Sequence, residues 1–300
     1  MDNEFRLLIL LGASPAPIHN MEDKLKSIIL GLKRHPWRFV ISIFLAYSAL
    51  WTLIESVAYF YPDLPLQGWK PHSIFIGVSV VIGLYRIYQP HKISIKINTS
   101  DTMLNIYYGD VFEAKGYTAI SVNEYFDSEL GAPVSDKSLH GMVIKRYFGG
   151  HPEAFDVAIA EDLDGCDFEQ IDRQGGNCKK YPIGTTAYVP ANEHKFLLFA
   201  LSHTNIETFK ASADLATMLS AMHGLFEKSR NSTGGEKLIL PLIGSGISGV
   251  GLPATQLLQL IVLTIIDETK KQQICKQIDL VLHESRFEEI DLETIKRQWI

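Results

Sequence analysis

The apolar positions of the chain follow two different patterns, one before and one after residue 90. Before it, residues 39–61 form a 23-residue apolar run with a single charged residue, Glu55. As a helix this run extends about 34 Å, which exceeds the roughly 30 Å of a bilayer's hydrocarbon core. A second run, residues 73–89, is shorter and carries Arg86 near its end, where the guanidinium can reach the interface. The pattern therefore predicts two membrane-spanning helices, and the alternative is a buried hairpin of a soluble protein.

Positive charge predicts the orientation of these spans. Lysines and arginines flank their outer ends, whereas the connecting segment 62–72 holds only Lys70. Basic residues accumulate on the cytoplasmic side, so both termini are expected in the cytoplasm. The flanking residues are Lys24, Lys26, Lys33, Arg34, Arg38, Lys92 and Lys96.

Residues 21–35 predict an amphipathic helix before the first span. Leu25, Ile28, Ile29 and Leu32 recur at helical spacing, with lysines on the flanks. Such a helix can lie on an anionic membrane surface, or it can pack as an ordinary surface helix on the second domain.

A polar stripe interrupts the first apolar run. Ser48, Thr52 and Glu55 share one helical face. A carboxylate inside a membrane is costly and suggests a functional role, such as lining a water-filled path in an oligomer. The alternative is hydrogen bonding across a helix pair, with Glu55 protonated or near the interface.

From residue 92 the pattern changes to short strands that alternate with helices. We expect strands at 92–98, 103–112, 119–126, 186–189, 196–203, 237–244 and 278–284, and helices at 138–148, 212–230, 254–271 and 292–299. This alternation predicts an α/β fold, a three-layer α/β/α sandwich around a mixed sheet. The chain then has three parts: a cytoplasmic N-terminal segment (1–36), a transmembrane hairpin (37–90) and an α/β domain (91–300). Ligands of such domains bind beyond the carboxyl ends of the strands.

Residues 244–251, GSGISGVG, follow a buried strand and precede a helix. Glycines let the backbone approach an anion, and successive N–H groups together with a helix N-terminus attract a phosphate or diphosphate. The alternative is a tight turn without a ligand. The predicted contacts are Gly244, Ser245, Gly246, Ile247, Ser248 and Gly249.

Two further strand ends carry candidate ligand-binding groups. Asp110 and Val111 lie at the end of the strand 103–112, and the Asp110 carboxylate can accept a hydrogen bond from an exocyclic amine. Asn123 lies near the end of the next strand, 119–126. Anion-binding N–H groups are then expected at the helix start formed by Ser138, Leu139, His140 and Gly141. His203, Thr204 and Asn205, at another strand end, either reach the distal end of the ligand or make ordinary strand-end hydrogen bonds.

The order of these motifs resembles the macro-domain family over about residues 92–285. The motifs that support this resemblance are G-D-V, a strand ending in Val-Asn, a loop leading into a helix, and P-L-I-G-S-G-I-S-G. The resemblance implies that Asp110 binds the adenine amine, that Val111 lies beside the base and that Asn123 faces the ribose distal to the adenine. Loops 136–141 and 245–249 would then embrace the diphosphate.

The motifs also depart from that family's pattern. Glu-Tyr-Phe follows Asn123 instead of Ala-Ala-Asn, and P-V-S-D-K-S-L-H-G replaces the first glycine-rich loop. These departures favour binding without turnover, and no residue is assigned as catalytic. A tethered ADP-ribosyl hydrolase remains an alternative, with Asp127, Glu124 and His140 as its nearby candidates. The second alternative is a passive membrane tether that binds ADP-ribosylated proteins.

Two spans fused to such a domain resemble the membrane-anchored ThsA effector family of type II Thoeris, a bacterial antiphage system. The resemblance implies residence in the bacterial inner membrane and a nucleotide signal made by a TIR-domain protein, a histidine-conjugated ADP-ribose. Binding of this signal would trigger self-association, disruption of membrane lipid and cell death.

Composition excludes several other classes of protein. The chain has 46% hydrophobic and 21% charged residues, unlike a disordered protein, and its net charge of −6 argues against nucleic acid as a partner. Its three cysteines form no CxxC and have no paired histidines at zinc spacing, so neither a metal nor a cofactor is expected.

Overall fold

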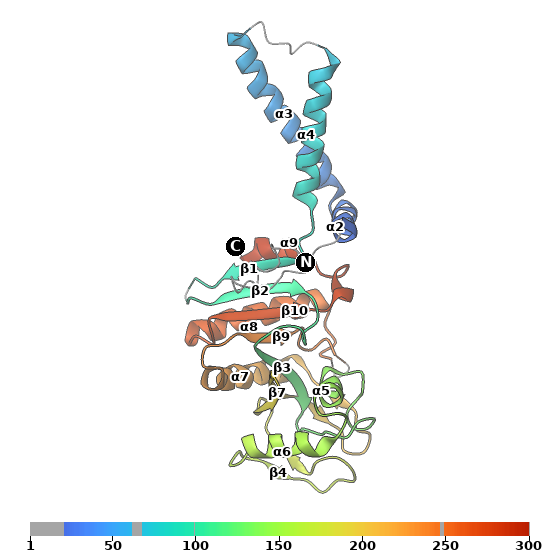
Figure 1. The fold of residues 1–300 in the computed structure, drawn as a ribbon, viewed down its shortest axis with the longest axis vertical. Coiled ribbons are helices and arrows are strands. Elements are labelled where there is room, and N and C mark those ends of the chain that lie inside the picture. The colour runs from blue at the N-terminus through green and yellow to red at the C-terminus, as the bar shows by residue number, and fades with distance from the viewer. Residues whose placement is uncertain (1–20, 62–67, 99, 247–248, 300) are drawn as a thin grey trace, which may run out of the picture. The chain divides into compact units, whose positions relative to one another are not determined.

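The computed structural model describes residues 21–61, 68–98, 100–246 and 249–299. Contacts within the chain divide it into two units, Met1–Pro90 and His91–Ile300, which are described separately below. Figure 1 labels the helices and strands of both.

The described part of the first unit is helical. It contains α2 (Met21–Arg34), α3 (Pro36–Phe60) and α4 (Trp69–Ile87). Helix α4 packs on α3 at Gly83, where an added Cβ would lie 2.9 Å from Ile43 and 3.0 Å from Phe39. Further along, the Tyr47 hydroxyl lies 2.8 Å from Nδ1 of His72. The small residue at position 83 therefore permits the close approach of the two helices.

The polar stripe lies on exposed surface of α3. Ser48, Thr52 and Glu55 are all exposed, and the Thr52 hydroxyl donates to the carbonyl oxygen of Ser48 in its own helix. The hydroxyl of Thr52 thus has a partner without a second helix, whereas the Glu55 carboxylate faces outward from an apolar surface.

Of the described helices, α3 is long and apolar enough to cross a membrane, with a mean hydropathy of 1.7 over its most apolar window. Helix α4 has the predicted position, but its mean hydropathy is too low for it to count as a candidate membrane span. Its first turn contains Lys70 and His72, and its last turn contains Arg86, so fewer of its residues are apolar. The second span therefore stays a prediction.

The second unit is an α/β domain. Its helices are α5 (Leu139–Tyr147), α6 (Pro152–Asp162), α7 (Leu215–Ser232), α8 (Ala254–Lys271) and α9 (Leu292–Trp299), with a 3₁₀ turn η1 (Glu284–Arg286). The strands of the main sheet are β1 (Lys92–Lys96), β2 (Met103–Tyr108), β3 (Tyr117–Asn123), β6 (Thr186–Ala191), β7 (His194–Thr204), β8 (Ala211–Ser212), β9 (Leu238–Pro241) and β10 (Gln277–Leu282). The short strands β4 (Glu169–Gln170) and β5 (Lys179–Lys180) pair with each other.

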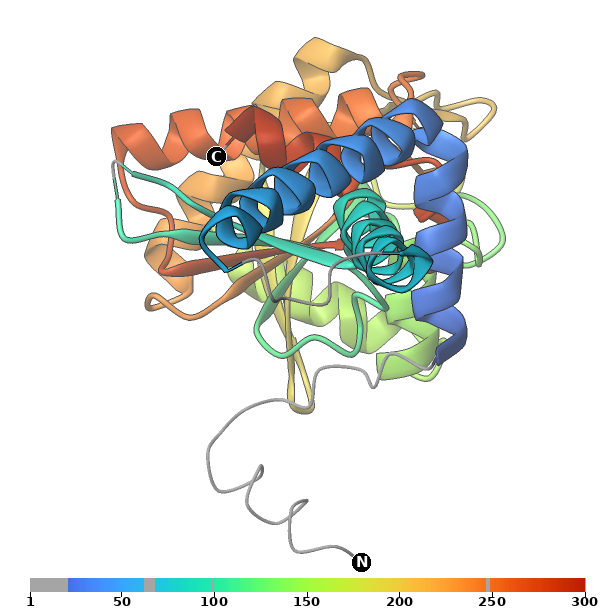
Figure 2. The same ribbon diagram turned by 90° about the horizontal axis from the view of Figure 1, so that it is seen from above.

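The sheet is mixed, with the order β1-β2-β10-β9-β3-β7-β6. The five central strands from β2 to β7 are parallel, while β1 and β6 add antiparallel edges. Parallel strands have both faces covered. One buried cluster joins the sheet to α7, α8 and α9, and the other joins it to α5 and α6 (Figure 2). The predicted α/β sandwich with a mixed sheet is confirmed.

Helix α6, the β4–β5 hairpin, the short strand β8 and the turn η1 were not predicted. Helix α6 has a weak apolar face, burying only Phe155 and Ile159. The hairpin of β4 and β5 has two residues in each strand, and such short strands leave no periodic signal in the sequence.

Candidate functional site

The carboxyl ends of the five parallel strands meet at one edge of the sheet. They bring together the segments that follow Tyr108, Leu282, Pro241, Asn123 and Thr204. Three of these segments carry predicted ligand-binding residues, and one carries the candidates 203–205. Residues far apart in the sequence thus share one edge, as the rule for open α/β sheets requires.

At the β2 end, Asp110 is exposed and held in place by its own loop. Its Oδ1 accepts a hydrogen bond of 2.9 Å from the Phe112 amide, and its Oδ2 lies 3.7 Å from Nη1 of Arg146. The Arg146 guanidinium also covers the Phe112 ring at 4.8 Å. Val111 is buried beneath. Because each carboxylate oxygen accepts more than one hydrogen bond, Asp110 retains capacity for an external donor.

At the β3 end, Asn123 is buried and its amide is bound inside the protein. Its Nδ2 donates to Oδ2 of Asp127 at 2.8 Å, and its Oδ1 accepts from the backbone amides of Tyr125 and Asp127. The side chain therefore shapes the loop after β3. The expectation that it faces a ligand ribose stays a prediction.

Asp127 is the centre of a buried ionic cluster. Arg173 Nη2 lies 2.8 Å from Oδ2 and 3.1 Å from Oδ1 of Asp127, and the Asn177 amide donates to Oδ1 at 2.7 Å. The Arg173 guanidinium lies over the Tyr125 ring at 4.1 Å. Because both side chains of the ion pair have no exposed surface, Asp127 is unavailable as a general base for an external substrate.

The start of α5 is capped by Ser138 and contains a buried histidine. The Ser138 hydroxyl accepts from the Gly141 amide at 3.0 Å, leaving the first-turn amides of Leu139 and His140 ahead of the first intrahelical bond. The His140 imidazole is buried near Phe155, and burial lowers its pKa to about 3. Its side chain is therefore neutral at physiological pH. The backbone at this position suits an anion, but the imidazole is no candidate acid.

The glycine-rich loop after β9 is tightly folded. Gly244 has a φ of +79°, and an added Cβ would lie 2.9 Å from Met218 and Val250. The Ser245 hydroxyl donates to the Leu242 carbonyl at 2.7 Å. Of the other predicted contacts, Gly246 and Gly249 are exposed, and Ile247 and Ser248 lie outside the described residues.

Glu124 and His203 form a polar pair between the ends of β3 and β7. The His203 Nδ1 lies 2.7 Å from Oε2 of Glu124, and the Thr204 amide donates to Oε1 at 3.2 Å. The side chain of Glu124 is 4% exposed, but that of His203 is 55% exposed. Asn205 differs, because its Oδ1 accepts three hydrogen bonds from Glu207 and Thr208 within its own turn.

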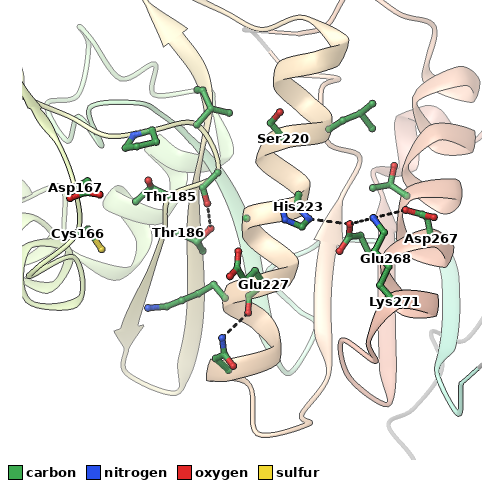
Figure 3. Close-up of a pocket in the computed structure, with 18 of the residues that line it drawn as sticks. Cys166, Asp167, Thr185, Thr186, Ser220, His223, Glu227, Asp267, Glu268 and Lys271 are labelled. Carbon is green, nitrogen blue, oxygen red and sulfur yellow. Dashed lines mark hydrogen bonds and ion pairs between the residues drawn. The ribbon is translucent and has the colours of Figure 1, made fainter.

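A separate groove of about 1380 Å³ lies along α7 and α8, away from the strand ends (Figure 3). It contains a similar pair, in which Nδ1 of His223 lies 3.0 Å from Oε1 of Glu268. Arg230 and Lys271 also bind Glu268. No sequence motif pointed to this groove.

Sequence reasoning missed several groups near the strand ends. Arg173 comes from the segment after β4, 46 residues beyond Asp127, and only the folded chain brings the pair together. Phe112 and Arg146 also lie too far apart in the sequence to form a motif. The only local signal was the glycine pair after Arg173, which is typical of a tight turn.

Comparison with known proteins gives the family. Residues 104–283 match the family model described as Thoeris protein ThsA, macro domain. The chain belongs to this ThsA family. The match covers more than half of the chain and includes all five parallel strands, the start of β2 excepted. No curated protein sequence matches the chain.

Solved structures similar to this ThsA-family chain include two of the Oceanobacillus iheyensis macrodomain. One is described with ADP; it is 15% identical, with 70% of this chain and 98% of that chain covered and a TM-score of 0.47. The other is a glycine-to-valine variant with ADPR; it is 15% identical, with 69% and 98% covered and a TM-score of 0.48.

Proposed function

We propose that the α/β domain binds an ADP-ribose-derived ligand along the carboxyl edge of its sheet, as part of a defence response. The observation that supports this most directly is that Asp110 and the Gly244 loop follow β2 and β9, two parallel strands of one sheet, in a ThsA-family macro domain. A carboxylate that accepts from an amine and backbone amides that receive anions suit an adenine and a diphosphate, respectively.

We further propose that the ligand is a histidine-conjugated ADP-ribose made by a TIR-domain partner. Binding can change the state of the chain only if the ligand prefers one assembly over another. In this proposal the ligand favours a self-associated form, which gathers the N-terminal helices in the bacterial inner membrane and disrupts its lipid. The exposed apolar surface of α3 supports the membrane part of the proposal.

Hydrolysis of the ligand is the competing function. The buried positions of Asp127 and His140 weaken it, since neither side chain reaches a bound substrate from outside. The Glu124–His203 pair favours hydrolysis, because an imidazole oriented by a carboxylate is the usual form of a general base. Release of free ADP-ribose from a modified protein by the full chain would support hydrolysis instead of binding alone.

Calorimetric titration of the full chain in detergent with ADP, ADP-ribose and its histidine conjugate tests the proposal. We expect binding of all three, tightest for the conjugate. Asp110→Ala should weaken all three by about tenfold, the cost of one charge-assisted hydrogen bond. Asp164→Ala, an exposed carboxylate after α6, is the matched control and should bind as the wild type does. Absence of binding by the wild-type chain would contradict the proposed function.

A further inference from the structure

The Glu124–His203 pair fixes which nitrogen of the imidazole carries the proton. An ionised carboxylate only accepts hydrogen bonds, so the nitrogen 2.7 Å from Glu124 must be the donor. In the neutral imidazole, Nδ1 therefore bears the hydrogen and Nε2 presents a lone pair. The exposed part of His203 is thus an oriented hydrogen-bond acceptor.

The surroundings of this pair are polar and largely bound within the protein. Lys180 Nζ lies 3.9 Å from Oε2 of Glu124, and the Thr204 amide donates to Oε1 of the same carboxylate. Beside them, the buried Thr204 hydroxyl has no hydrogen-bond partner in the part of the chain that the structure describes.

The position of His203 relative to Asp110 follows from the order of the strands. Between β2 and β7 lie β10, β9 and β3, so the two strand ends are four spacings of about 4.8 Å apart, on the order of 19 Å. A ligand with its adenine at Asp110 and its diphosphate over the middle strands extends its distal group towards the ends of β3 and β7.

We propose that His203 recognises the part of the ligand beyond the diphosphate by accepting an O–H or N–H hydrogen on Nε2, with Glu124 as its positioning residue. This inference rests on the proposed function, and it names the residue that distinguishes ADP-ribose derivatives from ADP. The Thr204 hydroxyl is a second polar group at the same subsite.

The test compares ADP, which lacks the distal group, with ADP-ribose and the histidine conjugate on full-chain variants in detergent. His203→Phe should weaken ADP-ribose and the conjugate by about tenfold and leave ADP unchanged. His203→Gln retains an acceptor oxygen near the position of Nε2 and should recover part of the affinity. Glu124→Gln can donate to Nδ1, which moves the proton to Nε2; it should weaken the same two ligands although its shape is preserved.

The pair in the groove of Figure 3 is a matched control. His223 resembles His203 in its exposure, 59% against 55%, and in its bond to a buried glutamate. His223→Phe should therefore bind all three ligands as the wild type does.

The outcomes separate the two proposals. If the wild type binds ADP and ADP-ribose and His203→Phe binds each of them as tightly as the wild type does, the proposed role of His203 is wrong and the proposed function stands. If the wild type binds none of the nucleotides, both fail. An equal loss of ADP and ADP-ribose affinity in His203→Phe would also overturn the inference, because it would place His203 outside the distal subsite.

Discussion

Arg173 Nη2 lies 2.8 Å from Oδ2 of Asp127, and neither side chain has any exposed surface. This pair joins the segment between β4 and β5 to the loop that follows β3. The same loop holds Asn123 and Glu124, so the pair fixes the backbone from which the proposed distal subsite is built. Its role in this arrangement is structural.

Breaking this ion pair should destabilise the domain strongly. Asp127→Asn or Arg173→Met leaves one buried partner without its counterion, and we expect the free energy of unfolding to fall by about 3–5 kcal/mol. Denaturant unfolding followed by circular dichroism measures the change. The exposed pair Lys195–Glu236 is the control, since solvent screens both charges and Lys195→Met should change stability far less. A similar small cost at Asp127 would refute the structural role.

Gly176 should be irreplaceable for the same reason. It has a φ of +70°, and an added Cβ would lie 2.2 Å from Arg173 Nη2 and 2.4 Å from Asp127 Oδ1. Gly176→Ala should therefore combine backbone strain with displacement of the ion pair and cost about 3 kcal/mol or more. Gly165, with a φ of +79° and open space around it, should tolerate alanine at about 1–2 kcal/mol. Equal costs would contradict the close packing at Gly176.

Burial of His140 should make the domain sensitive to acid. Its pKa is about 3 when folded, against about 6.5 in an unfolded chain, so below pH 6.5 the unfolded chain binds a proton that the folded one excludes. Stability should therefore fall with pH towards 3, by up to about 1.4 kcal/mol per unit. Urea unfolding at pH 7 and pH 5 measures this slope. His140→Leu should flatten it, and His151→Leu, at an exposed position, should leave it unchanged.

Glu268 should also make the domain sensitive to acid, over a lower range of pH than His140. Burial alone would raise its pKa, but hydrogen bonds from Arg230, Lys271 and His223 outweigh burial and lower the pKa to about 2. Its carboxylate therefore stabilises the fold above about pH 4.3, and this contribution disappears as pH falls towards 2. Glu268→Gln should cost about 1–3 kcal/mol at pH 7 and less at pH 3, measured by denaturant unfolding.

The control for this prediction is Asp267→Asn. Asp267 binds the same Lys271 but is 62% exposed, so its replacement should change stability by less than about 1 kcal/mol. An equal cost at the two positions would mean that burial of Glu268 adds nothing.

The polar stripe of α3 makes a prediction about the membrane effector. Glu55 is an exposed carboxylate on an otherwise apolar helix, so in a self-associated form it would meet polar groups of other copies. Glu55→Leu should abolish ligand-dependent leakage of dye from vesicles that contain the chain, while ligand binding stays normal. Leu53→Ala, also exposed on α3, should retain leakage. Unchanged leakage in Glu55→Leu would leave the stripe without a functional role.

The periodicity of the sequence was sufficient for most of the fold. Runs such as 237–244 and 254–271 are long and apolar enough to identify a buried strand and a core helix, and the structure has β9 and α8 there. Helix α6 was not predicted because its apolar face is weak, and the β4–β5 hairpin was not predicted because its strands are short. The second membrane span was predicted only in part: α4 is a helix, but its polar residues lower its mean hydropathy.

The residues of the candidate site also fall into those that the sequence could identify and those that only the fold brings together. By itself the sequence determined most of the elements and their order, because hydrophobic period and glycine-rich turns are local properties, and its strand-end motifs carried the resemblance to the family. Only the tertiary structure decided that Asn123 binds Asp127, that Arg173 completes this cluster, and that His203 is oriented by Glu124. Those contacts join residues up to seventy-nine positions apart, and the strand order that brings them together is set by packing of the whole sheet, which no local pattern encodes.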